Sequence, residues 1–116
     1  MKVLLLGSEG FVGKNLIDGL KNKCDLLTAD VSDIGTYENY EKFDITNFDN
    51  VMNITKDVDV IINLVTHTLT QSLDDILSNA QTNIIGLLNV LEACRKNNVK
   101  KSEYNIINII KLFIQS

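Results

Sequence analysis

The stretch that decides the fold is VLLLGSEGFVG, residues 3–13. Its apolar first part is typical of a strand buried on both faces, and it runs directly into Gly7, Gly10 and Gly13. A helical pattern of apolar residues starts at Phe11. Glycines at such a turn allow a tight bend, close approach of a ligand to backbone, and close packing of helix on strand. The stretch therefore predicts a site for a dinucleotide pyrophosphate at a helix N-terminus, the alternative being a plain strand–helix turn.

The overall composition is that of one globular domain spanning residues 1–116. The net charge of -4 favours neither a nucleic-acid nor an anionic membrane partner. No apolar run reaches the ~20 residues of a membrane span, and we expect no signal peptide. Cys24 and Cys94 have neither CxxC spacing nor a histidine cluster, so we expect structural thiols, no metal site and a cytoplasmic location.

Strand and helix patterns alternate along the chain. The strands are expected at 2–6, 25–29, 40–43, 58–65 and 105–114, and the helices at 11–21, 47–54 and 73–98. This order predicts an α/β, Rossmann-like open parallel sheet of about five strands with helices on both faces. One apolar stripe of the long helix is expected to comprise Leu77, Ala80, Ile84, Leu87, Leu88, Leu91 and Cys94.

Acidic residues follow two of the expected strands. Asp30 ends the second strand, where its carboxylate can accept hydrogen bonds from the adenosine ribose and would repel a 2′-phosphate. No arginine follows closely, so NAD is favoured over NADP; a solvated turn aspartate is the alternative. Asp44 ends the third strand and could accept from the adenine amino group while Ile45 packs on the ring. The alternative for Asp44 is a capping role.

The fourth strand ends in Leu64, Val65, Thr66 and His67. This strand should neighbour the first, so its end could contact the ribose and the pyrophosphate. The isolated His67 ring is interpreted as a loop residue rather than as a catalyst, because no serine, cysteine or carboxylate partner is identified for it.

These motifs, taken in order, resemble the extended short-chain dehydrogenase/reductases, specifically the NAD-dependent epimerase/dehydratase family acting on nucleotide sugars. Residues 7–13, GSEGFVG, look like that family's GxxGF(I/V)G. Residues 59–67, DVIINLVTH, are similar to its D-x-V-(I/V)-(H/N)-L-A-A-(H/Q/E), although Val65-Thr66 replaces the usual Ala-Ala. Residues 82–94, TNIIGLLNVLEAC, are similar to its N-V-x-G-T-x-N-(L/V)-L-E-A, the most specific match. The resemblance covers about residues 1–101.

The resemblance implies a set of residues lining an NAD site, with Asn83 also bracing the active-site backbone. The set is Gly7, Gly10, Phe11, Val12, Gly13, Asp30, Asp44, Ile45, Leu64, Val65, Thr66 and Asn83.

The end of the chain departs from the family pattern. Family members carry a catalytic Ser/Thr and a Tyr-x-x-x-Lys helix, and then a substrate domain, whereas no tyrosine here has a lysine four residues on. The tyrosine, its pKa lowered by the lysine, exchanges a proton with the substrate while hydride passes to or from nicotinamide. We therefore expect a C-terminally truncated domain without catalytic residues of its own, and residues 102–116 as an atypical tail forming an edge strand.

The leading interpretation is thus an NAD-binding domain of a nucleotide-sugar epimerase or dehydratase, incomplete for catalysis; His67 slightly favours an epimerase, hence an isomerase. The alternatives are a module that senses the dinucleotide, one half of a split enzyme, or a folded fragment without function. Apolar residues in 105–114, together with a long helix lacking a neighbour, predict a homodimer or a complementing chain.

Overall fold

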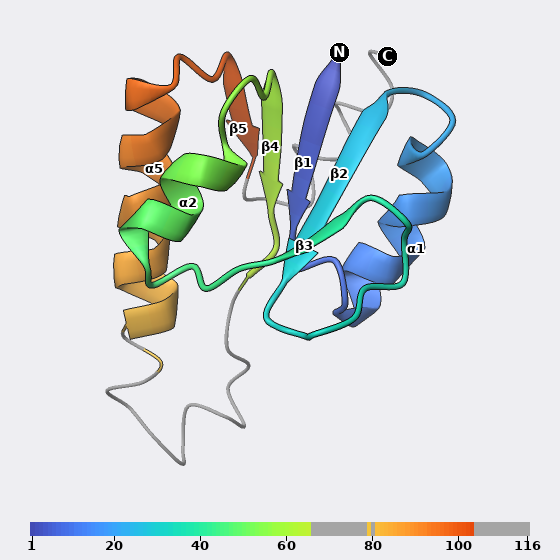
Figure 1. Cartoon of the computed structure of the whole chain (residues 1–116), viewed down its shortest axis with the longest axis horizontal. Coiled ribbons are helices and arrows are strands. Elements are labelled where there is room, and N and C mark those ends of the chain that lie inside the picture. Colours follow the sequence, from blue (N-terminus) through green and yellow to red (C-terminus); the bar gives the residue numbers. More distant parts are fainter. Residues whose placement is uncertain (66–78, 80, 104–116) are drawn as a thin grey trace.

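The computed structural model describes residues 1–65, 79 and 81–103. Within this part of the chain, one parallel sheet has the strand order β3-β2-β1-β4-β5 (Figure 1). The strands are β1 (Lys2–Leu6), β2 (Asp25–Asp30), β3 (Tyr40–Lys42), β4 (Val60–Asn63) and β5 (Lys101–Glu103). At the centre, Leu6 of β1 lies opposite Ala29 of β2 and Asn63 of β4. The chain order reverses between β1 and β4, and open parallel sheets bind ligands beyond the strand ends at such a point.

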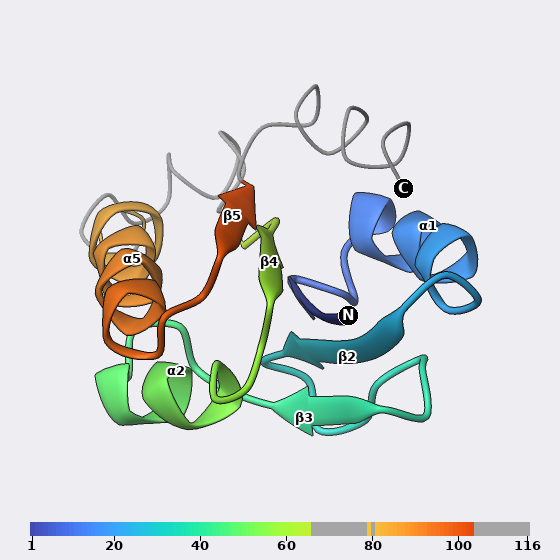
Figure 2. The same ribbon diagram turned by 90° about the horizontal axis from the view of Figure 1, so that it is seen from above.

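Helices cover both faces of the sheet (Figure 2). They are α1 (Phe11–Leu20), α2 (Phe48–Ile54) and α5 (Gly86–Lys96), the last preceded by a π-helical turn, η1 (Gln81–Ile85). Successive strand residues point to opposite faces, so Val3 and Leu5 join the cluster under α1 whereas Leu4 and Leu6 join the cluster under α2 and α5. The predicted Rossmann-like α/β architecture is confirmed.

Asparagines fix the ends of the helices on the second face. The Asn47 side chain caps α2 by accepting a hydrogen bond from the Asn50 amide at 3.2 Å. Asn98, after α5, has φ +55°, the left-handed conformation in which helices commonly end. Asn97 donates to Thr55 Oγ1 at 2.8 Å and so ties the end of α5 to the end of α2.

The fifth strand differs from the prediction. It begins at Lys101, with Val60 opposite Lys101 and Ile62 opposite Glu103. Ser102 and Glu103 are therefore part of the sheet, in its edge strand β5. After the turn at Asn98 the chain lies along the edge of β4. The strand pairs there through backbone hydrogen bonds, which do not require apolar side chains. The predicted strand over 105–114 lies outside the described residues.

The face that α5 presents to the core also differs from the predicted stripe. Its buried residues are the small ones, Gly86, Val90 and Ala93. A Cβ added at Gly86 would lie 2.8 Å from Cγ2 of Ile45, so only a small residue permits this approach. Three larger members of the stripe are exposed: Ile84 at 58%, Leu88 at 54% and Leu91 at 44%. Leu77 and Ala80 lie outside the described residues. No helix in the described ranges is long and apolar enough to cross a membrane.

Candidate functional site

The glycine-rich loop lies between the carboxyl ends of β2 and β4. Gly7 has φ +83°, which disfavours any residue with a Cβ. An added Cβ there would lie 3.0 Å from the carbonyl carbon of Leu64 and 3.1 Å from the amide nitrogen of Val65. On the other side, the Gly7 amide donates to the Ala29 carbonyl at 2.9 Å. These contacts bring Gly7, Leu64 and Val65 together at the switch point, as the sequence predicts.

Gly13 sets how closely α1 approaches this loop. Its Cβ, if present, would lie 2.3 Å from the Gly7 carbonyl oxygen and 2.8 Å from Cα of Ser8. Gly10 is different, because it is exposed and an added Cβ would meet only the Gly7 oxygen, at 3.5 Å. Gly13 therefore serves packing, whereas Gly10 leaves the approach to the loop open.

The N-terminus of α1 has no side-chain cap. Gly10 is the N-cap residue, so no side chain accepts from the first amides of the helix. The helical apolar pattern suggests that Phe11 and Val12 belong to the core. In the structure neither does, because Phe11 is 86% exposed and Val12 37% exposed. The open amides and the helix dipole together favour an anion at this position.

Asp30 lies beside the loop, with its carboxylate held by backbone. Oδ2 accepts from the Glu9 amide at 2.9 Å, and Oδ1 accepts from the Val31 amide at 2.7 Å. A carboxylate has about four lone-pair sites, so two remain for other donors such as ribose hydroxyls. Glu9 was not among the predicted residues; its Oε1 accepts from the Thr36 amide at 3.0 Å and from the Thr36 hydroxyl at 2.9 Å. This contact ties the glycine-rich loop to the segment after β2.

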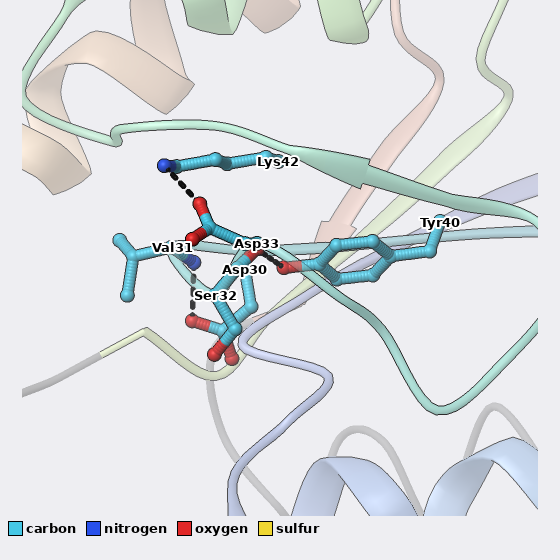
Figure 3. Close-up of polar contacts among 6 residues, drawn as sticks. All are labelled: Asp30, Val31, Ser32, Asp33, Tyr40 and Lys42. Atoms are coloured by element: carbon cyan, nitrogen blue, oxygen red, sulfur yellow. Dashed lines mark hydrogen bonds and ion pairs between the residues drawn. The ribbon is translucent and has the colours of Figure 1, made fainter.

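The segment after β2 is also fastened to β3 (Figure 3). The Tyr40 hydroxyl donates to the Ser32 carbonyl at 2.6 Å, and the Lys42 ammonium pairs with Asp33 Oδ1 at 2.5 Å. Partial burial, with the nearby charges of Asp30 and Glu9, raises the pKa of Tyr40. These hydrogen bonds fasten the segment after β2 beside Asp30, with Asp33 and Lys42 as one paired acid and base, and no local sequence pattern indicates them.

Asp44 and Ile45 make contacts within the protein rather than lying free for the adenine ring. Asp44 Oδ1 accepts from the Thr46 amide at 2.9 Å and from the Thr46 hydroxyl at 2.7 Å, which is a local turn contact. The capping role given as its alternative falls to Asn47, the N-cap of α2. Ile45 is a core residue, 3% exposed, against Gly86 of α5. The adenine contacts stay predictions, and the burial of Ile45 leaves little of its side chain for a ring.

The remaining predicted residues are described only in part. Leu64 and Val65 are half-buried, and the Leu64 amide continues the β1–β4 ladder by donating to the Leu6 carbonyl at 2.9 Å. Asn83 is half-buried in η1. Thr66 and His67 lie outside the described residues.

The loop has the donors and acceptors that a dinucleotide needs. The uncapped amides after Gly10 suit a pyrophosphate, and Asp30 retains acceptor capacity for hydroxyls. Oε2 of Glu9 is a buried acceptor without a hydrogen-bond partner, which also suits a hydroxyl donor. Within the described ranges, no group of three or more His, Cys, Asp or Glu side chains could hold a metal ion.

Solved structures of similar architecture are enzymes of which this chain spans only about a third. A GalE-like L-threonine dehydrogenase from Cupriavidus necator in its holo form has a TM-score of 0.84 at 20% identity, over 90% of this chain and 36% of that one. At that identity the likeness concerns the fold alone. The UDP-glucose 4-epimerase of Thermus thermophilus, in complex with NAD, has a TM-score of 0.76 at 25% identity, over 88% and 36%. The Thermotoga maritima UDP-glucose 4-epimerase with UDP-glucose has 0.78 at 27%, over 88% and 36%.

The family itself is shown by the sequence match. The model of the family described as "NAD dependent epimerase/dehydratase family" matches residues 3–107. That range extends past the expected limit of residue 101 and includes β5. Because the match covers most of its length, the chain belongs to the NAD-dependent epimerase/dehydratase family.

Proposed function

We propose that this chain binds NAD(H) at the carboxyl ends of β1, β2 and β4. The observation that carries the proposal is the uncapped N-terminus of α1 at Gly10, beside an Asp30 carboxylate that the Glu9 amide holds in place. The amides of Phe11 and Val12 would hold the pyrophosphate, and Asp30 would accept from the adenosine ribose. Leu64, Val65 and the other predicted residues of the set would line the rest of the site.

We propose that the chain does not turn over a substrate alone. Bound NAD would supply a hydride acceptor, but the accompanying proton needs an acid or base beside the substrate hydroxyl. None of the three tyrosines has a lysine four residues on to lower its pKa. Epimerisation or dehydration of a nucleotide sugar would therefore require an acid–base residue that residues 1–116 do not supply.

Two alternatives keep the same binding site. A dinucleotide-sensing module would bind NAD without any complementing chain, whereas one half of a split epimerase or dehydratase would gain activity when a chain carrying Tyr-x-x-x-Lys is added. Cys24 and Cys94 have neither CxxC spacing nor a histidine cluster in the sequence, which supports a reducing, cytoplasmic location for either.

The proposal is tested by titrating the chain with NAD in a calorimeter, for wild type and Asp30→Ala. We expect the substitution to raise the Kd roughly tenfold to hundredfold, because hydrogen bonds from ribose hydroxyls to a charged acceptor are lost. Asp18→Ala removes the same charge from an exposed site on α1, where Asp18 pairs only with Lys21, and should leave the Kd unchanged. Absence of any NAD binding by the wild type would refute the proposed function.

We also propose that the chain forms a homodimer through one exposed apolar stripe along η1 and α5, namely Ile84 of η1 and Leu88 and Leu91 of α5. Residues four and three apart share one helix face, and a two-fold axis would bury this face against its own copy. Leu88→Glu should shift sedimentation velocity from dimer to monomer without unfolding, since Leu88 is 54% exposed. Ile34→Glu, at an 84% exposed position off this helix, is the matched control and should not change the assembly. A wild type that is monomeric at high concentration would contradict the dimer.

A further inference from the structure

A cationic residue, Lys42, lies on the strand next to that of Asp30, a placement that the local sequence does not reveal. Lys42 is the register partner of Asp30 on β3, so the two residues are neighbours across adjacent parallel strands. Neighbouring strands lie about 4.8 Å apart, and register partners point to the same face. Figure 3 shows the Lys42 ammonium directed at Asp33, three residues beyond Asp30. The ammonium nitrogen lies 2.5 Å from Asp33 Oδ1.

This ion pair contributes little to holding the segment after β2. Both side chains are exposed, Lys42 at 61% and Asp33 at 85%, and exposed pairs contribute little to stability. The segment is fastened independently by the Tyr40 hydroxyl on the Ser32 carbonyl and by Glu9 on Thr36. The main effect of the Lys42–Asp33 pair is therefore electrostatic. It holds the ammonium of Lys42, a residue on the strand next to that of Asp30, against Asp33.

We propose that Asp33 is a specificity-determining residue of this site: by holding the Lys42 ammonium, it withholds the cation that a 2′-phosphate would need, and so enforces NAD over NADP. The inference rests on the proposed NAD binding. The hydrogen bond from Lys42 lowers the pKa of Asp33, which favours its carboxylate form. With Glu9, Asp30 and Asp33 set against Lys42, the surroundings of the ribose are negative overall, which disfavours a phosphate dianion.

The test measures the Kd of NAD and of NADP by calorimetry for the wild type, Asp33→Asn, Asp33→Glu, and Asp33→Asn combined with Lys42→Gln. Asp33→Asn should tighten NADP by roughly fivefold, the scale of one exposed ion contact, and change the Kd of NAD by less than about twofold. Asp33→Glu should retain the wild-type ratio, because it can still engage Lys42. The double variant should lose the gain, and the gain of the single variant should shrink as salt is raised.

Three results would overturn the inference while leaving NAD binding intact. They are a wild type that binds NADP as tightly as NAD, an Asp33→Asn variant with an unchanged ratio of the two affinities, and a gain that persists after Lys42→Gln. A wild type that binds neither dinucleotide would overturn this inference together with the proposed function. Asp33 and Lys42 are exposed, and a thermal melt of each variant verifies that the fold is retained.

Discussion

Gly13→Ala should destabilise the domain by about 3 kcal/mol and lower its melting temperature by about 10 °C or more. The reason is the 2.3 Å that would separate the new Cβ from the Gly7 carbonyl oxygen, together with 2.8 Å to Cα of Ser8. Both neighbours are backbone atoms of the loop between β1 and α1, so relief requires the helix to move away from the sheet. Ile17 and Leu20 would then lose their packing on Val3 and Leu5.

The sign of this effect distinguishes packing from helix propensity. Glycine inside a helix is about 1 kcal/mol worse than alanine, so propensity alone predicts that Gly13→Ala stabilises the fold. Gly19→Ala supplies the matched control, because Gly19 is an exposed residue of the same helix, α1. It should raise the melting temperature slightly. Urea unfolding followed by circular dichroism measures both variants, and a Gly13→Ala variant as stable as the wild type would show that the close approach is wrong.

The sequence predicts the elements near the glycine loop well because their determinants are local. The run of Val3 to Leu6 and the three glycines specify a buried strand, a left-handed turn and a helix start within a few residues of one another. Gly7 at φ +83° and Asn98 at φ +55° confirm positions where the residue type itself indicates the backbone conformation.

Where two faces of a helix are both apolar, periodicity alone does not decide which one is buried. Along η1 and α5 the larger residues Ile84, Leu88 and Leu91 make the stronger pattern, yet Gly86, Val90 and Ala93 face the core. The decision comes from Ile45, which lies far away in sequence and leaves room only for a small residue at Gly86. Such a choice depends on tertiary packing that a single helix does not encode.

The contacts that Lys42 and Glu9 make near Asp30 are not predicted from the sequence, for the same reason. Lys42 is opposite Asp30 only because β3 pairs with β2 in that register, and Glu9 contacts Thr36 only because the loop and the segment after β2 converge. A search for an arginine in the few residues after Asp30 therefore does not find Lys42, the cation that we propose to matter for a 2′-phosphate.

Gly10→Val should abolish most NAD binding without a comparable loss of stability. Gly10 has φ -75° and ψ 171°, a conformation open to any residue, and its Cβ would meet only the Gly7 oxygen at 3.5 Å, an ordinary contact. We expect the stability to change by about 0.5 kcal/mol or less, as at exposed positions generally. The added methyl groups would instead cover the open side of the loop, where the phosphates must approach the amides of Phe11 and Val12. Hydrogen bonds from amides to a charged group are each worth about 1.5–3 kcal/mol, so losing them should raise the Kd for NAD roughly hundredfold or more.

Gly10→Val and Gly13→Ala, with Gly19→Ala as the control, then separate the two functions of the loop, which are NAD binding and packing. Gly10→Val should lose NAD binding in calorimetry and keep its melting temperature. Gly19→Ala should keep NAD binding and melt slightly higher, and Gly13→Ala should lose stability first. ADP-ribose, which carries the same pyrophosphate and adenosine ribose, should follow NAD in every variant because the nicotinamide is not involved in these contacts. If Gly10→Val binds NAD as tightly as the wild type, the pyrophosphate does not lie over this loop. The helix N-terminus at Gly10 would then be only the start of a helix packed on its sheet.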